Sequence, residues 1–305
     1  MNQRLIIFIV ILSSFHLNGQ TRFFENADSL HRLRTIAVTT SISTVWAGSI
    51  IGLSSIWYSD ANKTSFHFFD DSKNWLQMDK VGHIYTANKI SCLTGDLYVW
   101  GGMKNKPAAL TGFGIGVGYQ LSFEFLDAYS SDWGFSWSDL GANILGSSVY
   151  LAQQLVWEEQ RILLKFSTHP TEYAQYRPDV LGSGFGERLL KDYNGQTYWL
   201  SASPGAFMKN GGFPKWLCFS VGYSVDEKLV GDQENYIHFG NSPPTALNEF
   251  NSKRELLFSL DIDFSQFKIK RPWLRALVKQ FNYLKVPFPA VIISGNKVGG
   301  SWIYF

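Results

Sequence analysis

Three long stretches without a charged residue limit what this chain can fold into. They cover residues 35–59, 108–123 and 140–157. Each is long enough for at least four helical turns, and at about 1.5 Å per residue the first can cross the hydrocarbon core of a bilayer. The many Ser and Thr residues in the first stretch also suit a helix buried inside protein. The stretches therefore predict long helices, the first of which either crosses a membrane or is buried.

Glycines in these stretches indicate close packing between helices. Gly112, Gly114, Gly116 and Gly118 form two interleaved Gly-x-x-x-Gly pairs. Each glycine destabilises a solvated helix by roughly 1 kcal/mol relative to alanine, so such a helix persists where neighbouring backbones pack closely against it. The first stretch carries a similar pair at Gly48 and Gly52, for which we expect close helix contact too.

Polar residues between the apolar stretches fall at helical spacings. Asp79 and His83 are four residues apart, Glu124 and Asp127 three, and Asp139 and Asn143 four. Each pair therefore shares one helix face, and we expect three helices to direct these pairs to one interior point. Asp79 also suits the N-cap or the first turn of its helix, and Asp139 suits the capping of a helix N-terminus.

The chemistry of this polar set has several interpretations. His83, Glu124, Asp127 and Asp139 are candidates for acid–base catalysis or for binding a divalent metal. Alternatively, the set is a structural network in which Glu124 and Asp127 pair with Lys80 or Arg161 and His83 is hydrogen-bonded in the core, because unpartnered buried carboxylates are costly. The sequence has no Gly-x-Ser-x-Gly, phosphate-binding loop or His-Glu-x-x-His motif. We therefore expect a structural or binding role without a cofactor, with an enzyme or metal site as the alternative.

The N-terminus and the composition indicate an envelope protein. Residues 1–20 resemble a secretory signal, with Arg4 before an apolar segment, and an uncleaved anchor is the alternative. No Cys follows this segment, which excludes lipid attachment there. The chain is 16% aromatic and 17% charged, a profile typical of membrane-associated proteins, and it lacks the long basic run that nucleic-acid binding favours. We expect Cys92 and Cys218 to be buried free thiols, although one disulfide is possible in an oxidising compartment.

The second half of the chain has a different pattern. Alternating apolar segments predict antiparallel strands at residues 196–200, 216–225, 255–264, 290–294 and 300–305. Short helices are expected at residues 186–191 and 272–284. The latter is amphipathic and suits anionic head groups, with basic residues at Lys268, Lys270, Arg271, Arg275 and Lys279. We expect an α+β fold in which residues 21–165 form a membrane-associated, Gly-rich bundle of about four helices and residues 166–305 contain the strands.

A second candidate site lies at the start of the strand region. Tyr193, Asn194, Tyr198 and Trp199 combine flat rings with an amide, the side chains that sugar recognition uses. The same stretch also suits a hairpin packed on its own domain, with a tight turn at Asn194-Gly195.

The ordered polar motifs carry a family resemblance. Asp79-Lys80-x-Gly-His83, Phe-Glu124-x-x-Asp127 and Gly-Phe-Ser-x-x-Asp139-x-x-Ala-Asn143 are similar to motifs of the YfiM-like family of predicted periplasmic lipoproteins of unknown function. A more distant similarity is to VanZ-like membrane proteins. The resemblance implies motif positions at Asp79, Lys80, His83, Glu124, Asp127, Asp139 and Asn143, and it implies no particular activity.

Together these patterns predict an exported, membrane-associated envelope protein that faces the periplasm, in either the inner or the outer membrane. We expect membrane lipid as a partner, with an envelope protein or a glycan as further candidates. The alternative function is an enzyme or metal-dependent site that acts on lipid head groups or glycan precursors.

Overall fold

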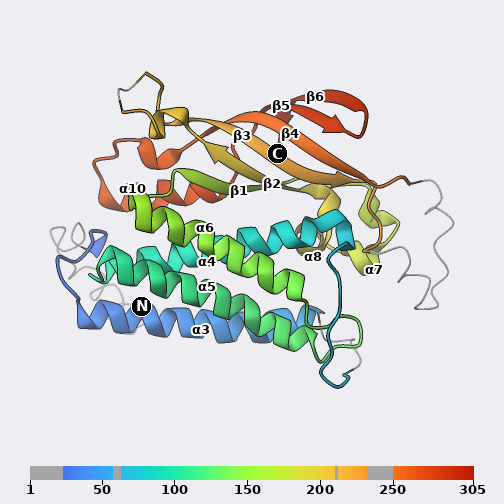
Figure 1. Cartoon of the computed structure of the whole chain (residues 1–305), viewed down its shortest axis with the longest axis horizontal. Coiled ribbons are helices and arrows are strands. Elements are labelled where there is room, and N and C mark those ends of the chain that lie inside the picture. The colour runs from blue at the N-terminus through green and yellow to red at the C-terminus, as the bar shows by residue number, and fades with distance from the viewer. Residues whose placement is uncertain (1–22, 58–62, 210–211, 232–249) are drawn as a thin grey trace, which may run out of the picture.

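A computed structural model describes residues 23–57, 63–209, 212–231 and 250–305. The expected signal segment, residues 1–20, lies outside these residues. A layer of long helices lies against an antiparallel sheet, and the helices precede the strands in the sequence (Figure 1). This confirms the expected α+β class.

Four long helices make up the first layer: α3 (Arg32–Trp57), α4 (Met78–Trp100), α5 (Asn105–Asp127) and α6 (Trp137–Trp157). The helices α4, α5 and α6 pack against one another. Glycines permit this approach, since a Cβ on Gly116 would lie 2.1 Å from Ser91 Oγ and one on Gly146 would lie 2.1 Å from Ile84 O. The motif-bearing helices therefore meet backbone to backbone at these points.

Helix α3 is peripheral. It lies on the far side of α4–α6 from the sheet (Figure 1). Its segment Arg32–Gly52 is the one helical segment in the described residues that is long and apolar enough to cross a membrane, and 6% of its most apolar window is buried. A Cβ at Gly48 or Gly52 would meet no atom within 4 Å, so among the described residues no neighbouring helix packs against the Cβ side of these glycines. Contact with α5 comes instead from Trp46, which lies against Gly118.

Six strands form one sheet in sequence order, each antiparallel to its neighbours. They are β1 (Ile162–Thr168), β2 (Gln196–Ala202), β3 (Leu217–Asp226), β4 (Lys253–Ile262), β5 (Phe288–Ser294) and β6 (Lys297–Tyr304). The five strands expected from the sequence overlap β2 to β6, whereas β1 was missed. The charge of its central Lys165 is typical of a surface residue. In the structure this side chain is fully buried, and its Nζ lies 3.1 Å from Asp261 Oδ2. The expected division at residue 165 therefore falls inside a strand.

Short helical elements connect the two layers and the strands. They are η1 (Asn74–Gln77), η2 (Tyr173–Gln175), α7 (Pro178–Leu181), α8 (Phe185–Lys191), η3 (Tyr193–Gly195), η4 (Pro204–Ala206), η6 (Phe264–Gln266), α10 (Pro272–Gln280) and η7 (Phe281–Tyr283). The tight turn expected at Asn194-Gly195 is instead the 3-10 turn η3, because the Asp192 side chain accepts a hydrogen bond from the Asn194 N–H. Cys92 and Cys218 are buried and free, as expected.

Candidate functional site

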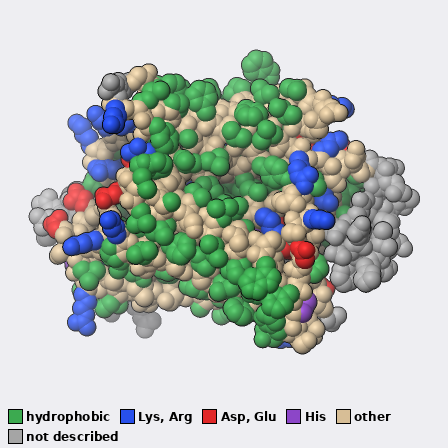
Figure 2. All heavy atoms as spheres, viewed as in Figure 1, with side chains coloured by type: hydrophobic (Ala, Val, Ile, Leu, Met, Phe, Trp, Pro, Cys, Tyr) green, Lys and Arg blue, Asp and Glu red, His purple; other side chains and the backbone are tan. Residues whose placement is uncertain are grey.

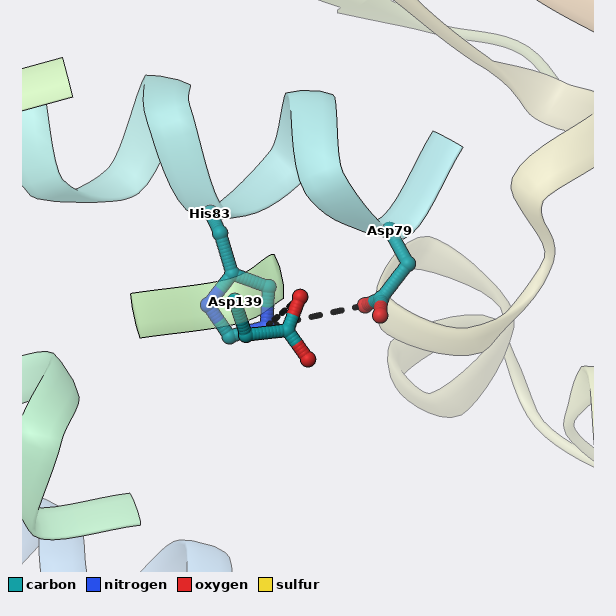
Figure 3. Close-up of side chains that lie close together, drawn as sticks. All are labelled: Asp79, His83 and Asp139. Atoms are coloured by element: carbon teal, nitrogen blue, oxygen red, sulfur yellow. Dashed lines mark ion pairs between the residues drawn. The ribbon is translucent and has the colours of Figure 1, made fainter. Parts of the chain in front are cut away.

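The helical polar pairs meet at one end of the bundle. The first turns of α4 contribute Asp79 and His83, and the first turn of α6 contributes Asp139. Figure 3 shows these three side chains directed toward one another from the two helices. His83 Nε2 lies 3.7 Å from Asp79 Oδ1 and 3.7 Å from Asp139 Oδ1. Glu124, in the last turn of α5, approaches the other ring nitrogen, Nδ1, at 3.8 Å.

Lys80 lies at the centre of the acidic side chains. Its Nζ is 2.7 Å from Asp71 Oδ2, 2.7 Å from Asp139 Oδ1 and 3.0 Å from Asp79 Oδ2. Three carboxylates thus share one buried ammonium group, which offsets the cost of burying them. The sequence analysis did not identify Asp71 as a site residue. Asp71 lies in the loop before α4, where no helical spacing relates it to the other acids.

A left-handed turn joins that loop to α4. Trp75, Leu76 and Gln77 have φ values of 52°, 53° and 68°. Three consecutive non-glycine residues in this region are unfavourable by roughly 1–2 kcal/mol each. Tertiary hydrogen bonds hold the turn: the Tyr223 hydroxyl donates to Leu76 O, and Trp75 N donates to Gly231 O at 3.0 Å. Backbone strain of this kind gathers at functional sites, where the surrounding structure enforces it.

The cap expected at Asp139 and the ion pair expected for Glu124 are wrong, whereas Asp79 lies in the first turn of α4, one of the two roles expected for it. Ser136, not Asp139, caps α6, because its Oγ accepts a hydrogen bond from Asp139 N at 3.1 Å. The Asp139 side chain is thereby free to pair with Lys80. Neither Lys80 nor Arg161 forms an ion pair with Glu124 in the described residues; Arg161 pairs with Glu159 at 2.7 Å.

A hydrogen-bonded network holds the His83 ring on its Nδ1 side. His83 Nδ1 lies 3.0 Å from Asn143 Oδ1, which also accepts from Gln120 Nε2 at 3.2 Å. Because the amide oxygen only accepts, Nδ1 carries a proton and Nε2 is directed toward Asp79 and Asp139. Gln120 lies four residues before Glu124 on α5, so the helical spacing rule could have identified it. Glu124 Oε1 and Asn143 Nδ2 are buried without a hydrogen-bond partner among the described residues.

Three groups in the cluster bind protons more tightly than usual. The pKa of Glu124 is raised to about 8, first by burial, which the charge of His83 opposes, and then by the Asp139 carboxylate. The pKa of Asp139 is raised to about 7 by burial and by the charge of Asp79. Burial would lower the pKa of His83, but the carboxylates of Asp79, Asp139 and Glu124 outweigh it and raise this pKa to about 9.

The pKa values of Asp71 and Asp79 shift in the opposite direction, below the usual value of an aspartate. Burial would raise the pKa of Asp79, but the charges of His83 and Lys80 outweigh it and lower this pKa. The pKa of Asp71 is also lowered, because hydrogen bonding with Asp139 and the charge of Lys80 outweigh burial. The cluster at pH 7 therefore has two cations, two ionised carboxylates, a largely neutral Glu124 and a partly ionised Asp139, so its net charge is small.

The cluster opens into a cavity of about 730 Å³. Asp71, Asp79, His83 and Asp139 lie on its wall, together with Asp127, which is farther along α5. Much of the remaining wall is aromatic or aliphatic and includes Phe69, Trp75, Phe123, Trp133, Leu189 and Leu190. The cavity is therefore amphipathic, with acidic, basic and hydroxyl groups beside large apolar side chains.

The second candidate site divides between this cavity and the protein interior. Tyr193 and Tyr198 line the cavity, and the Tyr193 hydroxyl donates to Asp79 Oδ1 at 2.9 Å. Asn194 and Trp199 are buried elsewhere: Asn194 Nδ2 donates to Lys228 O at 2.8 Å, and Trp199 Nε1 donates to Ser167 Oγ at 2.9 Å. The four residues therefore do not form one exposed sugar-binding platform.

A divalent metal has a candidate ligand set here. One ligand atom from each of Asp79, His83 and Asp139 lies within 4.8 Å of the others. Imidazole and carboxylate suit ions such as Zn²⁺ and Mn²⁺. However, Lys80 Nζ already contacts both carboxylates, so an ion would have to compete with a covalently tethered cation.

Comparison with known proteins gives one match. No curated protein and no solved structure matches the chain. Residues 67–154 match the model of a family described as "Predicted periplasmic lipoprotein (DUF2279)". This segment contains Asp71 and every motif residue from Asp79 to Asn143. The match supports the expected class of predicted periplasmic lipoproteins, without extending to the narrower YfiM name or to the VanZ-like similarity. Over α4, α5 and α6, the helices that build the cluster, the chain is thus similar to a family of predicted periplasmic lipoproteins.

Proposed function

We propose that this chain is an exported envelope protein, associated with a membrane and facing the periplasm, whose cavity binds the polar head of an amphipathic molecule. The observation that carries the proposal is the cavity of about 730 Å³, where the polar cluster and large apolar side chains share one wall. Ligand sites combine a mainly apolar lining with a few fixed polar groups in this way. Residues 1–20 would direct export, and the exposed, apolar α3 would provide membrane association.

The small net charge of the cluster indicates which class of head group the cavity binds. Lys80 and His83 balance most of the charge on Asp71, Asp79 and Asp139. A site with small net charge gains little from a bare ion, but it offers donors and acceptors side by side. An uncharged or zwitterionic head group, such as a sugar or an amine-bearing phosphoester, fits these groups best.

The accessibility of the cluster favours binding over a purely structural network. The side chains of Asp79 and His83 are 22% and 21% exposed and reach the cavity, whereas Glu124 behind them is almost fully buried. A structural network gains nothing from leaving charged groups beside an opening. The strained turn before α4 supports the same conclusion, because it helps to shape the cavity wall.

Acid–base chemistry on the bound head group is a second candidate. Asn143 holds His83 at Nδ1, and Nε2 lies beside the cavity at 3.7 Å from both Asp79 and Asp139, an arrangement that allows these groups to exchange a proton with a ligand. The pKa values of His83 and Glu124 are raised, whereas that of Asp79 is lowered. The titratable groups of the cluster therefore hold protons to different extents, as in acid–base sites.

A cavity-filling substitution tests the binding proposal. Leu190 lines the cavity and is 45% exposed, while Leu155 on α6 is 44% exposed and lies outside the cavity lining. Protein is purified from membranes in mild detergent, and retained lipids and glycolipids are identified by native mass spectrometry. We expect wild type and Leu155→Trp to retain the same amphipathic molecule and Leu190→Trp to lose it. Equal retention in both variants, or no retained molecule in wild type, would contradict the proposal.

A further inference from the structure

The sheet is apolar on an exposed face. Leu200, Val221, Phe258 and Val291 occupy successive strands and are paired side by side from β2 to β5. Each is between 41% and 52% exposed. Phe219 and Leu260 form a second exposed apolar pair in the adjacent row. Because side chains alternate along a strand, these residues define one face of the sheet, here named the apolar face.

The opposite side of the same strands is buried, and it combines polar groups with a small apolar cluster of Trp199, Leu257 and Ala290. Ser201, Ser220 and Asp261 are at most 2% exposed, and Ser201 Oγ donates to Asp261 Oδ2 at 2.8 Å. Lys165 completes this group by pairing with Asp261. A sheet that faces water on one side buries its apolar residues and exposes its polar ones. On its other side this sheet also exposes apolar residues, as do strands whose outer side contacts lipid.

One face of the molecule has few charged side chains in its middle. In Figure 2 the Lys, Arg, Asp and Glu side chains gather toward the two ends of the visible face, and its middle is largely hydrophobic or uncharged. The sequence shows the same spacing, since Lys215 and Asp226 bracket the uncharged core of β3, and Arg34 precedes the uncharged residues of α3.

Of these elements, β3 and α3 are long enough to cross a bilayer, whereas the seven-residue β2 and β5 extend about 23 Å at roughly 3.3 Å per residue. A strand of 10 residues such as β3 extends about 33 Å at roughly 3.3 Å per residue. The 26 residues of α3 extend about 39 Å at roughly 1.5 Å per residue. Both reach across a hydrocarbon core of about 30 Å.

We propose that the apolar face of the sheet contacts the acyl chains of the same bilayer that surrounds α3. The sheet and α3 lie on opposite sides of α4, α5 and α6 (Figure 1). Phe166 and Tyr198, on the same side of the sheet as Leu200, pack against Tyr85 of α4, so the proposed lipid contact covers the part of the apolar face beyond α4. The polar cluster lies where the uncharged stretches of α5 and α6 end, which places it at the level of the head groups. This inference rests on the membrane association proposed above and adds the sheet as a lipid-binding surface.

Photolabelling locates the lipid contacts. The full chain is reconstituted in vesicles of phosphatidylethanolamine and phosphatidylglycerol that contain a phospholipid with a diazirine on its acyl chain. After illumination, adducts are mapped by mass spectrometry. We expect adducts on α3 and on the exposed positions of β3 and β4, Val221 and Phe258 among them. Adducts on α3 alone would overturn this inference and leave membrane association intact, with a second copy or another protein covering the sheet. Absence of adducts would contradict both.

A charge substitution provides an independent test with a matched control. Phe258 belongs to the apolar face, and Phe185 on α8 is 81% exposed outside it. We expect Phe258→Arg to lower the folded, vesicle-bound fraction about tenfold, because an arginine in the middle of a lipid-facing strand is strongly unfavourable. Phe185→Arg should leave that fraction unchanged. Equal fractions for the two variants would overturn the inference, and the photolabelling of wild type remains decisive if Phe258→Arg fails to fold.

Discussion

Tyr193, in the turn before β2, donates a hydrogen bond to Asp79 at the start of α4, across 114 residues of sequence and at 2.9 Å. The bond connects the strand-containing half of the chain to the polar cluster of the helices. It also joins two candidate sites that the sequence presented as separate. The cavity is therefore built by both halves, and neither half alone completes it.

Removing this hydroxyl tests the connection. Tyr193→Phe should lower the free energy of unfolding by about 1–3 kcal/mol, because the bond is made to an ionised carboxylate in a buried setting. Denaturant unfolding monitored by circular dichroism measures the change. Tyr176→Phe is the control, since Tyr176 is 44% exposed and should lose little. Similar small losses in both variants would mean that the bond contributes nothing to stability.

The pH dependence of stability follows from the raised pKa values. His83, with a pKa near 9 in place of 6.5, contributes stability that is complete below pH 6.5 and is lost as the pH rises toward 9. Glu124, with a pKa near 8 in place of 4.5, also binds its proton more tightly in the folded state, so its contribution falls as the pH rises from 4.5 to 8. We therefore expect the melting temperature to fall steadily between pH 6 and pH 8, above which Lys89 and Lys285, whose pKa values burial lowers to about 8, act in the opposite direction.

Glu124→Gln isolates the carboxyl part of this effect. The neutral amide cannot ionise, so the variant should lose less stability than wild type between pH 5 and pH 8 while retaining the loss due to His83 above pH 6.5. Melting curves of both proteins across this range give the comparison. A melting temperature that rises with pH, or identical profiles for the two proteins, would refute this assignment of proton-binding groups.

Local periodicity predicted the part of the site that helices build. The i, i+4 spacing of Asp79 with His83 and of Asp139 with Asn143 depends only on helix geometry, and the glycines of α5 allow those helices to approach. Asp71 and Tyr193 could not be found this way. Their positions depend on a left-handed turn and on tertiary contacts that leave no periodic pattern in the sequence.

Strand β1 illustrates a second limit of sequence reasoning. Lys165 is buried in that strand, but its charge resembles a surface position until Asp261, nearly a hundred residues later, is known to face it. The cap expected at Asp139 failed for a related reason. Asp139 is a good cap by type, but Ser136 takes that role and leaves the carboxylate to Lys80.

Close helix contact at Gly116 can be tested against a neighbour on the same helix. A Cβ on Gly116 would lie 2.1 Å from Ser91 Oγ and 2.8 Å from Ala87 O, whereas one on Gly114 would meet no described atom within 4 Å. Gly116→Leu should therefore lower stability by about 3 kcal/mol or more through overpacking. Gly114→Leu should be neutral or mildly stabilising, because leucine favours the helix over glycine. Thermal melts that do not separate the two variants would contradict the packing of α5 against α4.

Replacing the central ammonium group tests whether Lys80 occupies the place that a metal would take. Lys80→Met leaves Asp71, Asp79 and Asp139 facing one another without their shared cation, and the loss of a buried partner should lower stability by about 3–5 kcal/mol. Mn²⁺ or Zn²⁺ should restore part of this loss, because Asp79, His83 and Asp139 can then ligate the ion without competition. Wild type should show no shift in melting temperature with either ion and no stoichiometric metal on elemental analysis. A wild-type protein that retains one ion, and loses it in His83→Gln, would instead establish a metal site and show that Lys80 does not exclude it.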